Sequence, residues 1–116
     1  MGTNILEREF ATFQPQGYLS AANAGDFLQQ LTEVVNSSTK SSLLVDMQQV
    51  EFIDSAGLMA LIKGFHLAKD LDCGLSICSV APSVRMIFEL TQLDKVFDIF
   101  DNQDSFKKTI KLDSAL

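Results

Sequence analysis

The stretch from Leu43 to Ala68 limits the possible folds more than any other part of the sequence. It opens with the apolar run Leu43–Val45, passes through a short alternating segment at 50–53, and ends in a long helical pattern. A buried strand that feeds a tight loop and then an amphipathic helix is typical of a sheet with helices packed against it. The apolar residues at helical spacing are Leu58, Leu61, Ile62, Phe65 and Ala68.

Strand and helix patterns also alternate on both sides of this stretch. Such alternation predicts an α/β fold with a largely parallel sheet. At 116 residues the chain suits a single domain over 1–116, and we expect residues 110–116 to form a frayed tail. The further elements that we expect are strands at 5–19, 75–80 and 96–100, and helices with apolar faces at 27–35, 84–90 and 106–110.

The charge balance disfavours two classes of partner. Nine Lys and Arg residues face fifteen Asp and Glu residues, which gives a formal net charge of −6. Nucleic acids and anionic membranes both reward basic patches, so we expect neither as the main partner. No apolar run approaches the length of a membrane span, and we expect a cytoplasmic protein.

The cysteine and histidine content argues against a disulfide and against a metal site. In an extended segment, Cys73 and Cys78 would lie roughly 16 Å apart, whereas a disulfide needs Cα atoms within about 7 Å. We therefore expect two reduced, structural cysteines. His66 is the single histidine, which excludes a multi-histidine metal site, and we predict no cofactor.

Ser55 lies where the central helix should begin. A serine there usually acts as an N-cap, but its hydroxyl would also lie near unpaired N–H groups that favour a phosphate. The preceding Asp54 could hold the loop through bonds to backbone N–H groups, which is the role we favour, or could orient the serine for a kinase. Gly57 should allow close packing of the helix start.

The segment Val50–Leu58, which reads Val-Glu-Phe-Ile-Asp-Ser-Ala-Gly-Leu, resembles the signature of the STAS domain. The resemblance is to the bacterial anti-sigma factor antagonists in particular, whose signature is an apolar pair, Asp-Ser, a small residue, Gly and Leu. It implies that Ser55 is the regulatory phosphorylation site. The order of elements over most of the chain is also similar. The resemblance further implies antiparallel pairing within 5–19, hence a small mixed, mostly parallel sheet of four to five strands packed against about four helices.

The same resemblance implies a role in partner switching. The unphosphorylated form would bind a serine protein kinase that also acts as an anti-sigma factor. That kinase would phosphorylate the serine and so end binding, and a PP2C-type phosphatase would restore the hydroxyl. One position departs from the family pattern: Ser20 stands where an aspartate near the phosphorylated serine is common.

The outer face of the central helix is a candidate binding surface. Met59, Lys63 and His66 follow i, i+4, i+7 spacing and begin one turn after Ser55. They could form an ordinary solvated face or a docking surface, and Met59 is more apolar than a solvated face needs. The predicted partner-binding residues are Asp54, Ser55, Met59, Lys63 and His66.

We predict a binding module and not an enzyme. A Ser-His-Asp triad would need His66, which lies eleven residues after Ser55, or about 16 Å along the helix axis. Two other functions stay open. One is a constitutive scaffold or accessory subunit, for example of a lipid transporter. The other is a receiver domain phosphorylated on Asp54, although only Glu7 and Glu9 could supply its acidic pair for magnesium.

Overall fold

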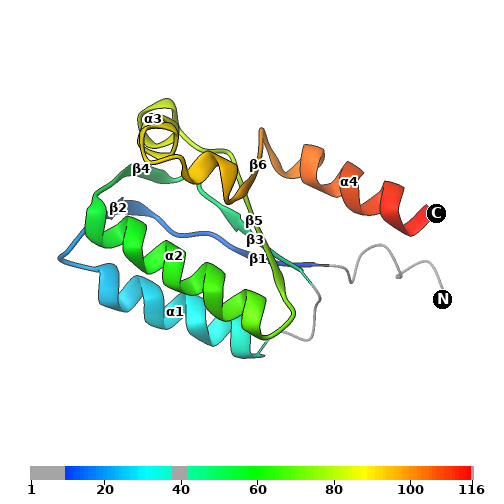
Figure 1. Cartoon of the computed structure of the whole chain (residues 1–116), viewed down its shortest axis with the longest axis horizontal. Coiled ribbons are helices and arrows are strands. Elements are labelled where there is room, and N and C mark those ends of the chain that lie inside the picture. The colour runs from blue at the N-terminus through cyan, green and yellow to red at the C-terminus, as the bar shows by residue number, and fades with distance from the viewer. Residues whose placement is uncertain (1–9, 38–41, 116) are drawn as a thin grey trace.

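The chain alternates strands and helices along its length (Figure 1). The computed structural model describes residues 10–37 and 42–115, with side chains described up to residue 110. The helices are α1 (Ala24–Ser37), α2 (Ser55–Asp70), α3 (Pro82–Leu90) and α4 (Gln103–Ala115), with a short 3-10 turn η3 (Leu93–Lys95). The strands are β1 (Phe10–Phe13), β2 (Gly17–Leu19), β3 (Ser42–Asp46), β4 (Val50–Ile53), β5 (Gly74–Cys78) and β6 (Asp98–Phe100).

All strand pairs in the described part of the chain are parallel. The main sheet has the order β1-β3-β5-β6, and β2 and β4 form a separate two-stranded ribbon. The predicted α/β class with four helices is confirmed. The antiparallel pairing expected within 5–19 is wrong for 10–19, where β1 pairs with β3 and β2 pairs with β4. Residues 5–9 lie outside the described residues.

The two faces of the main sheet are covered differently. Helices α1 and α2 lie side by side over one face, and α4 extends away from the rest of the domain (Figure 1). Alternate residues of β3 follow this division. Leu43 and Val45 belong to the large core, whereas Leu44 packs in a second cluster with Cys78 and Phe106 of α4. Phe106 therefore anchors α4 to the sheet.

Small residues bring α2 close to α1. Ala60 and Gly64 are buried, and a methyl group added at Gly64 would collide with the side chain of Leu31 in α1. In the apolar stripe predicted for this helix, Leu58, Leu61 and Ala68 are buried, and the half-buried Ile62 and Phe65 pack against the core. The spacing of hydrophobic residues in a sequence reveals where large apolar side chains pack. The contact between α1 and α2 depends instead on small residues, which that spacing does not reveal.

Helix α2 ends at Asp70, and Leu71 is its C-cap residue. The Cys73 N–H donates to the Ala68 carbonyl at 2.8 Å, and Asp72 adopts a left-handed conformation with φ of 58°. Cys73 and Cys78 are both buried and free, and burial raises the pKa of each thiol. At the end of α3, Leu90 departs from its predicted apolar face, because 77% of its surface is exposed.

Candidate functional site

Helix α2 begins at Ser55, but its N-cap is Asp54. The Asp54 backbone is extended, with φ −103° and ψ −173°, and its Oδ1 accepts a 3.0 Å hydrogen bond from the Gly57 N–H. The expectation that Ser55 is the cap is therefore wrong by one residue. Because the carboxylate of Asp54 already reaches the third helical N–H, Ser55 is free to be the first helical residue and its side chain stays exposed.

The other carboxylate oxygen of Asp54 binds a distant loop. Oδ2 accepts a 3.2 Å bond from the Ala21 N–H, and the Asp54 N–H donates to the Leu19 carbonyl at 3.0 Å. Asp54 thus joins the start of α2 to the loop between β2 and α1. This is the loop-holding role favoured for Asp54 from the sequence.

These bonds keep Asp54 charged. The hydrogen bond from the Gly57 N–H is the largest influence and lowers the pKa of the Asp54 carboxyl below its ordinary value, with Ala21 contributing in the same direction. Partial desolvation opposes this shift without cancelling it. A negative charge at the first turn also interacts favourably with the helix dipole.

Gly57 allows β2 to pass close to the first turn of α2. A methyl group at this position would lie 2.8 Å from the Leu19 carbonyl carbon and 2.9 Å from Leu19 Cβ, both shorter than packed atoms tolerate. The glycine is therefore needed for close approach, as the sequence suggested. It lets the Leu19 carbonyl reach the Asp54 N–H.

Ser55 and the predicted stripe lie on one exposed face of α2. Met59, Lys63 and His66 are all exposed, and Met59 leaves 51% of its surface open to solvent. Residues 55, 59 and 66 are spaced by close to one and two turns of an α-helix. The Ser55 hydroxyl and the stripe therefore face the same side of α2. The structure brings the predicted partner-binding residues together on one surface.

Ser20 belongs to the loop that Asp54 holds. Its N–H donates to Asn23 Oδ1 at 2.9 Å, and the Asn23 amide donates to the Tyr18 carbonyl at 2.7 Å. These bonds close the turn before α1 with no need for a carboxylate at position 20. The departure from the family pattern is therefore compatible with the local backbone.

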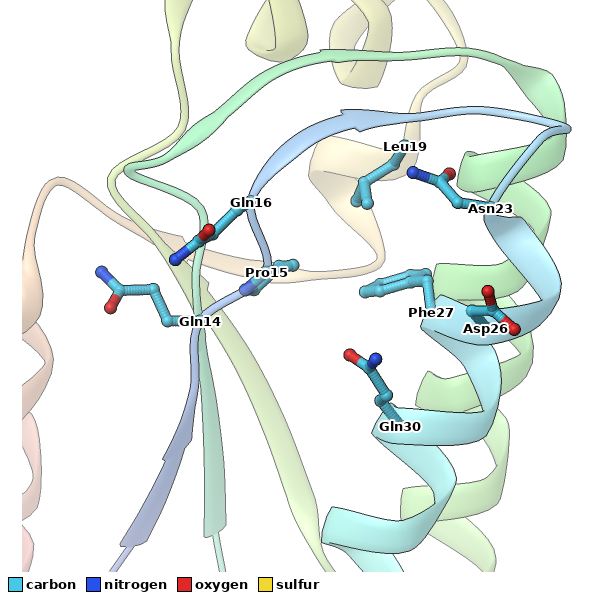
Figure 2. Close-up of a pocket in the computed structure, with 8 residues that line it drawn as sticks. All are labelled: Gln14, Pro15, Gln16, Leu19, Asn23, Asp26, Phe27 and Gln30. Atoms are coloured by element: carbon cyan, nitrogen blue, oxygen red, sulfur yellow. The ribbon is translucent and has the colours of Figure 1, made fainter.

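A cavity of about 360 Å³ lies elsewhere, between the β1–β2 turn and α1 (Figure 2). Gln14 and Gln16 come from the turn, whereas Asp26 and Gln30 project from the helix. None of the predicted partner-binding residues lines it. In the described residues there is no group of His, Cys, Asp and Glu side chains that could hold a metal ion, and no helix is long and apolar enough to cross a membrane.

Sequence reasoning missed a buried carboxylate at the end of β3. Asp46 is only 2% exposed. Its Oδ2 accepts bonds from Gln103 at 2.7 Å and Gln14 at 3.3 Å, and its Oδ1 accepts one from the Gln48 N–H at 2.9 Å. The buried oxygens of Asp46 thus have hydrogen-bond donors that carry no charge. The bond from Gln103 also connects the first residue of α4 to the sheet. The available signal was a charged residue that directly follows the apolar run Leu43–Val45.

A second missed feature is an exposed aromatic pair on the two-stranded ribbon. Tyr18 and Phe52 are paired across β2 and β4, and their ring centroids lie 6.2 Å apart. Tyr18 is 60% exposed and Phe52 42% exposed. The alternation of residues 50–53 suggested an ordinary strand and did not indicate which strand pairs with it.

The fold agrees with that of known proteins. The anti-sigma F factor antagonist of Paenibacillus polymyxa is 23% identical over 74 residues, which span 64% of this chain and 63% of that relative, so the match covers less than two thirds of the relative's length. A sulfate transporter family protein from Wolinella succinogenes superposes with a TM-score of 0.77 at 19% identity, covering 90% of this chain and 86% of that one.

The phosphorylated form of SpoIIAA, a cell fate determinant of Bacillus, is a further structural neighbour. It superposes with a TM-score of 0.64 at 12% identity, covering 88% of this chain and 92% of that chain. The family model of the STAS domain matches residues 5–106, which include every element from β1 to β6 and the start of α4. The chain belongs to the STAS domain family.

Proposed function

We propose that this protein is a phosphorylation-controlled binding module that acts as an anti-sigma factor antagonist and is switched at Ser55. The observation that carries the proposal is the placement of Ser55. Its side chain is exposed at the first position of α2, within the STAS signature, where helical N–H groups favour negative charge. The names of the Paenibacillus and Bacillus relatives support the role and the modification.

The partner in this proposal is a serine protein kinase that is also an anti-sigma factor. The Ser55 Oγ attacks the γ-phosphorus of ATP held by the kinase. An Oγ–P bond forms, the bond from the γ-phosphorus to the bridging oxygen breaks, ADP leaves, and the hydroxyl proton passes to a base on the kinase. A PP2C-type phosphatase reverses the change: water attacks the phosphorus, inorganic phosphate leaves, and the serine hydroxyl is restored.

The binding surface consists of Asp54, Ser55, Met59, Lys63 and His66. A phosphate adds about −1.5 to −2 charge at neutral pH. It would lie beside the charged Asp54 carboxylate, so an interface built around a neutral hydroxyl would meet repulsion and a desolvation cost. The helix start can accommodate the phosphate, so the fold does not have to change when binding ends.

Ser55 is a better phosphate acceptor than Asp54. Both carboxylate oxygens of Asp54 already accept bonds, from the Gly57 and Ala21 N–H groups. An acyl phosphate on Asp54 would turn one of these carboxylate oxygens into a bridging oxygen, which accepts hydrogen bonds less strongly, and would disturb the helix start. A phosphate on the exposed Ser55 hydroxyl breaks none of the hydrogen bonds described for the loop. We place the module in the bacterial cytoplasm, because thiols such as those of Cys73 and Cys78 stay reduced in that compartment.

Intact-mass analysis of the protein from its native cells tests the proposal. We expect a species heavier by one phosphate in the wild type and none in Ser55→Ala, with the modified peptide containing Ser55. The added mass should survive acid, because serine esters persist whereas acyl phosphates hydrolyse.

Three outcomes would contradict this proposal. Extra mass that persists in Ser55→Ala, or that maps to the exposed Ser83 or Thr91, would assign the phosphate to another residue. Acid-labile mass would point to Asp54 and a receiver-like domain. An unmodified protein that co-purifies with membrane transporter subunits would favour the scaffold role that the Wolinella neighbour suggests.

A further inference from the structure

The ribbon of β2 and β4 carries a β-bulge that exposes two consecutive residues. Gly17 pairs with Val50 but Tyr18 pairs with Phe52, so Glu51 is an extra residue in β4. Val50 and Ile53 lie three positions apart, a spacing that would put them on opposite faces of a regular strand, yet both are buried. The extra residue of the bulge allows Val50 and Ile53 to face the same side, and it leaves both Glu51 and Phe52 exposed.

The exposed residues of the ribbon combine aromatic surface with negative charge. The rings of Tyr18 and Phe52 form a tilted pair, and Glu51 directly precedes Phe52. Next to them lies an open hollow of about 680 Å³ whose lining residues include Glu51, Gln16 and Gln49. No Lys, Arg or His lines this hollow. A carboxylate, two amides and two aromatic rings together suit a ligand group that is cationic, planar and rich in hydrogen-bond donors.

The backbone around this surface is held at several points. The Ser83 hydroxyl of α3 donates to the Glu51 carbonyl at 3.3 Å, and the Gly17 N–H donates to the Gln49 carbonyl at 2.8 Å. Asn23 holds the Tyr18 carbonyl. The strand then leads from Phe52 through the buried Ile53 into Asp54, so the exposed ribbon residues come shortly before the proposed switch in the chain. A backbone held at these points lowers the cost of ordering the ribbon on binding.

We propose that Tyr18, Glu51 and Phe52 form a docking site for an arginine side chain of the protein partner. The guanidinium group stacks on the exposed rings and pairs with the Glu51 carboxylate, and its other N–H groups reach the amide-lined hollow. The occupant follows from charge complementarity, since the lining carries one carboxylate and no cation. The identity of that partner rests on the proposed function, but the arginine site does not, because it needs no phosphate at Ser55.

An NMR titration with a short probe peptide tests the site in the protein alone. The probe is acetyl-Gly-Arg-Gly-amide, and its neutral isostere has citrulline in place of arginine. We expect the arginine peptide to produce saturable amide shifts at Tyr18, Glu51 and Phe52 in the millimolar range. The citrulline peptide should produce shifts about fivefold smaller, because citrulline lacks the charge.

Matched variants separate the site from general charge effects. Glu51→Gln should abolish saturation and Phe52→Leu should weaken it, whereas Asp98→Asn, which removes an exposed carboxylate from β6, should change nothing. The assignment is overturned if the arginine peptide leaves the ribbon amides unshifted, if its shifts survive Glu51→Gln, or if the lysine analogue binds as well as arginine.

A kinetic measurement connects the site to the partner. With the kinase that modifies Ser55, Glu51→Gln should raise KM for this protein about tenfold without changing kcat, since docking lies outside the reacting group. An unchanged KM would remove the kinase as the source of the arginine. If no kinase modifies Ser55 while the peptide still binds, the proposed function fails and the arginine site stands.

Discussion

The carboxylate of Asp54 accepts a hydrogen bond from the backbone N–H of Ala21, a residue 33 positions earlier in the chain. The same carboxylate caps α2 through Gly57. One side chain therefore fixes both the helix that carries Ser55 and the loop that lies against its start. The placement of the proposed switch depends on this carboxylate more than on Ser55 itself.

Replacing Asp54 should cost more stability than replacing Ser55. Asp54→Ala removes the cap and the bond to Ala21, and we expect its Tm to fall by several degrees. Ser55→Ala should leave Tm almost unchanged, because the serine is the first helical residue and not the cap. Thermal unfolding followed by circular dichroism measures both variants. Equal losses in the two would mean that Ser55 also caps the helix.

The three glycines in the helices that the structure describes should respond differently to alanine. Gly57→Ala places a methyl group against the Leu19 backbone, which cannot move without disturbing β2, and should destabilise by about 1–3 kcal/mol. Gly64→Ala meets side-chain atoms of Leu31 and no backbone, so it should cost less. Gly25→Ala meets nothing within 4 Å and should stabilise by about 0.4–1 kcal/mol. Urea denaturation measures the unfolding free energies of the three variants. A Gly57→Ala variant as stable as the wild type would refute the close approach of Leu19 to Gly57.

Acid should reveal the contribution of Asp54. Its pKa is lower in the folded protein than in the unfolded chain, so its charge stabilises the fold above the ordinary carboxyl pKa, about 4. That stabilisation should be lost as pH falls through the lower, folded-state pKa. We therefore expect Asp54→Asn to be less stable than the wild type at pH 7, with the gap closing at low pH. A gap that is constant with pH would show that the ionised carboxylate is not required.

Variants on the outer face of α2 test the partner-binding surface. Ser55→Asp, Met59→Ala and Lys63→Glu should each weaken binding to the partner kinase, on the order of fivefold or more for the last two. Exposed charges are screened beyond about 8–10 Å, so the switch at Ser55 can act only on contacts near it. Titration calorimetry gives the affinities.

Lys107→Glu is the control for that surface, because Lys107 is exposed on α4, on the other side of the sheet. It should leave the affinity unchanged. If all three α2 variants bind as tightly as the wild type while remaining folded, the partner docks elsewhere. A loss of binding in Lys107→Glu would instead point to long-range charge effects.

The sequence predicted the class of the fold because its apolar patterns are strong. The run at 43–45 is a buried strand and the stripe after Ser55 is a helix, as expected. The pairing of β1 and β2 could not be read in this way, because strand direction depends on partners that lie more than 30 residues away. The close packing at Gly64 was equally hidden, since it arises from side chains that are absent.

The N-cap of the helix at the candidate site was predicted with an error of one residue. Asp54 and Ser55 are both good N-caps, so local preference could not decide between them. The choice is made by the Leu19 carbonyl and the Ala21 N–H, which reach Asp54 from another part of the chain. The bulge at Glu51 was missed for a similar reason, because a strand by itself does not show how it pairs.

The parallel pairing described for the sheet has a consequence for synthesis on the ribosome. In the described part of the chain, β1 has no partner until β3 emerges, and β2 has none until β4 emerges. Pairings of this kind close long loops before they gain contacts, which slows folding. A nascent chain that has not passed residue 53 therefore exposes strand edges, and the bond from Ala21 to Asp54 can form only after both strands of the ribbon are complete.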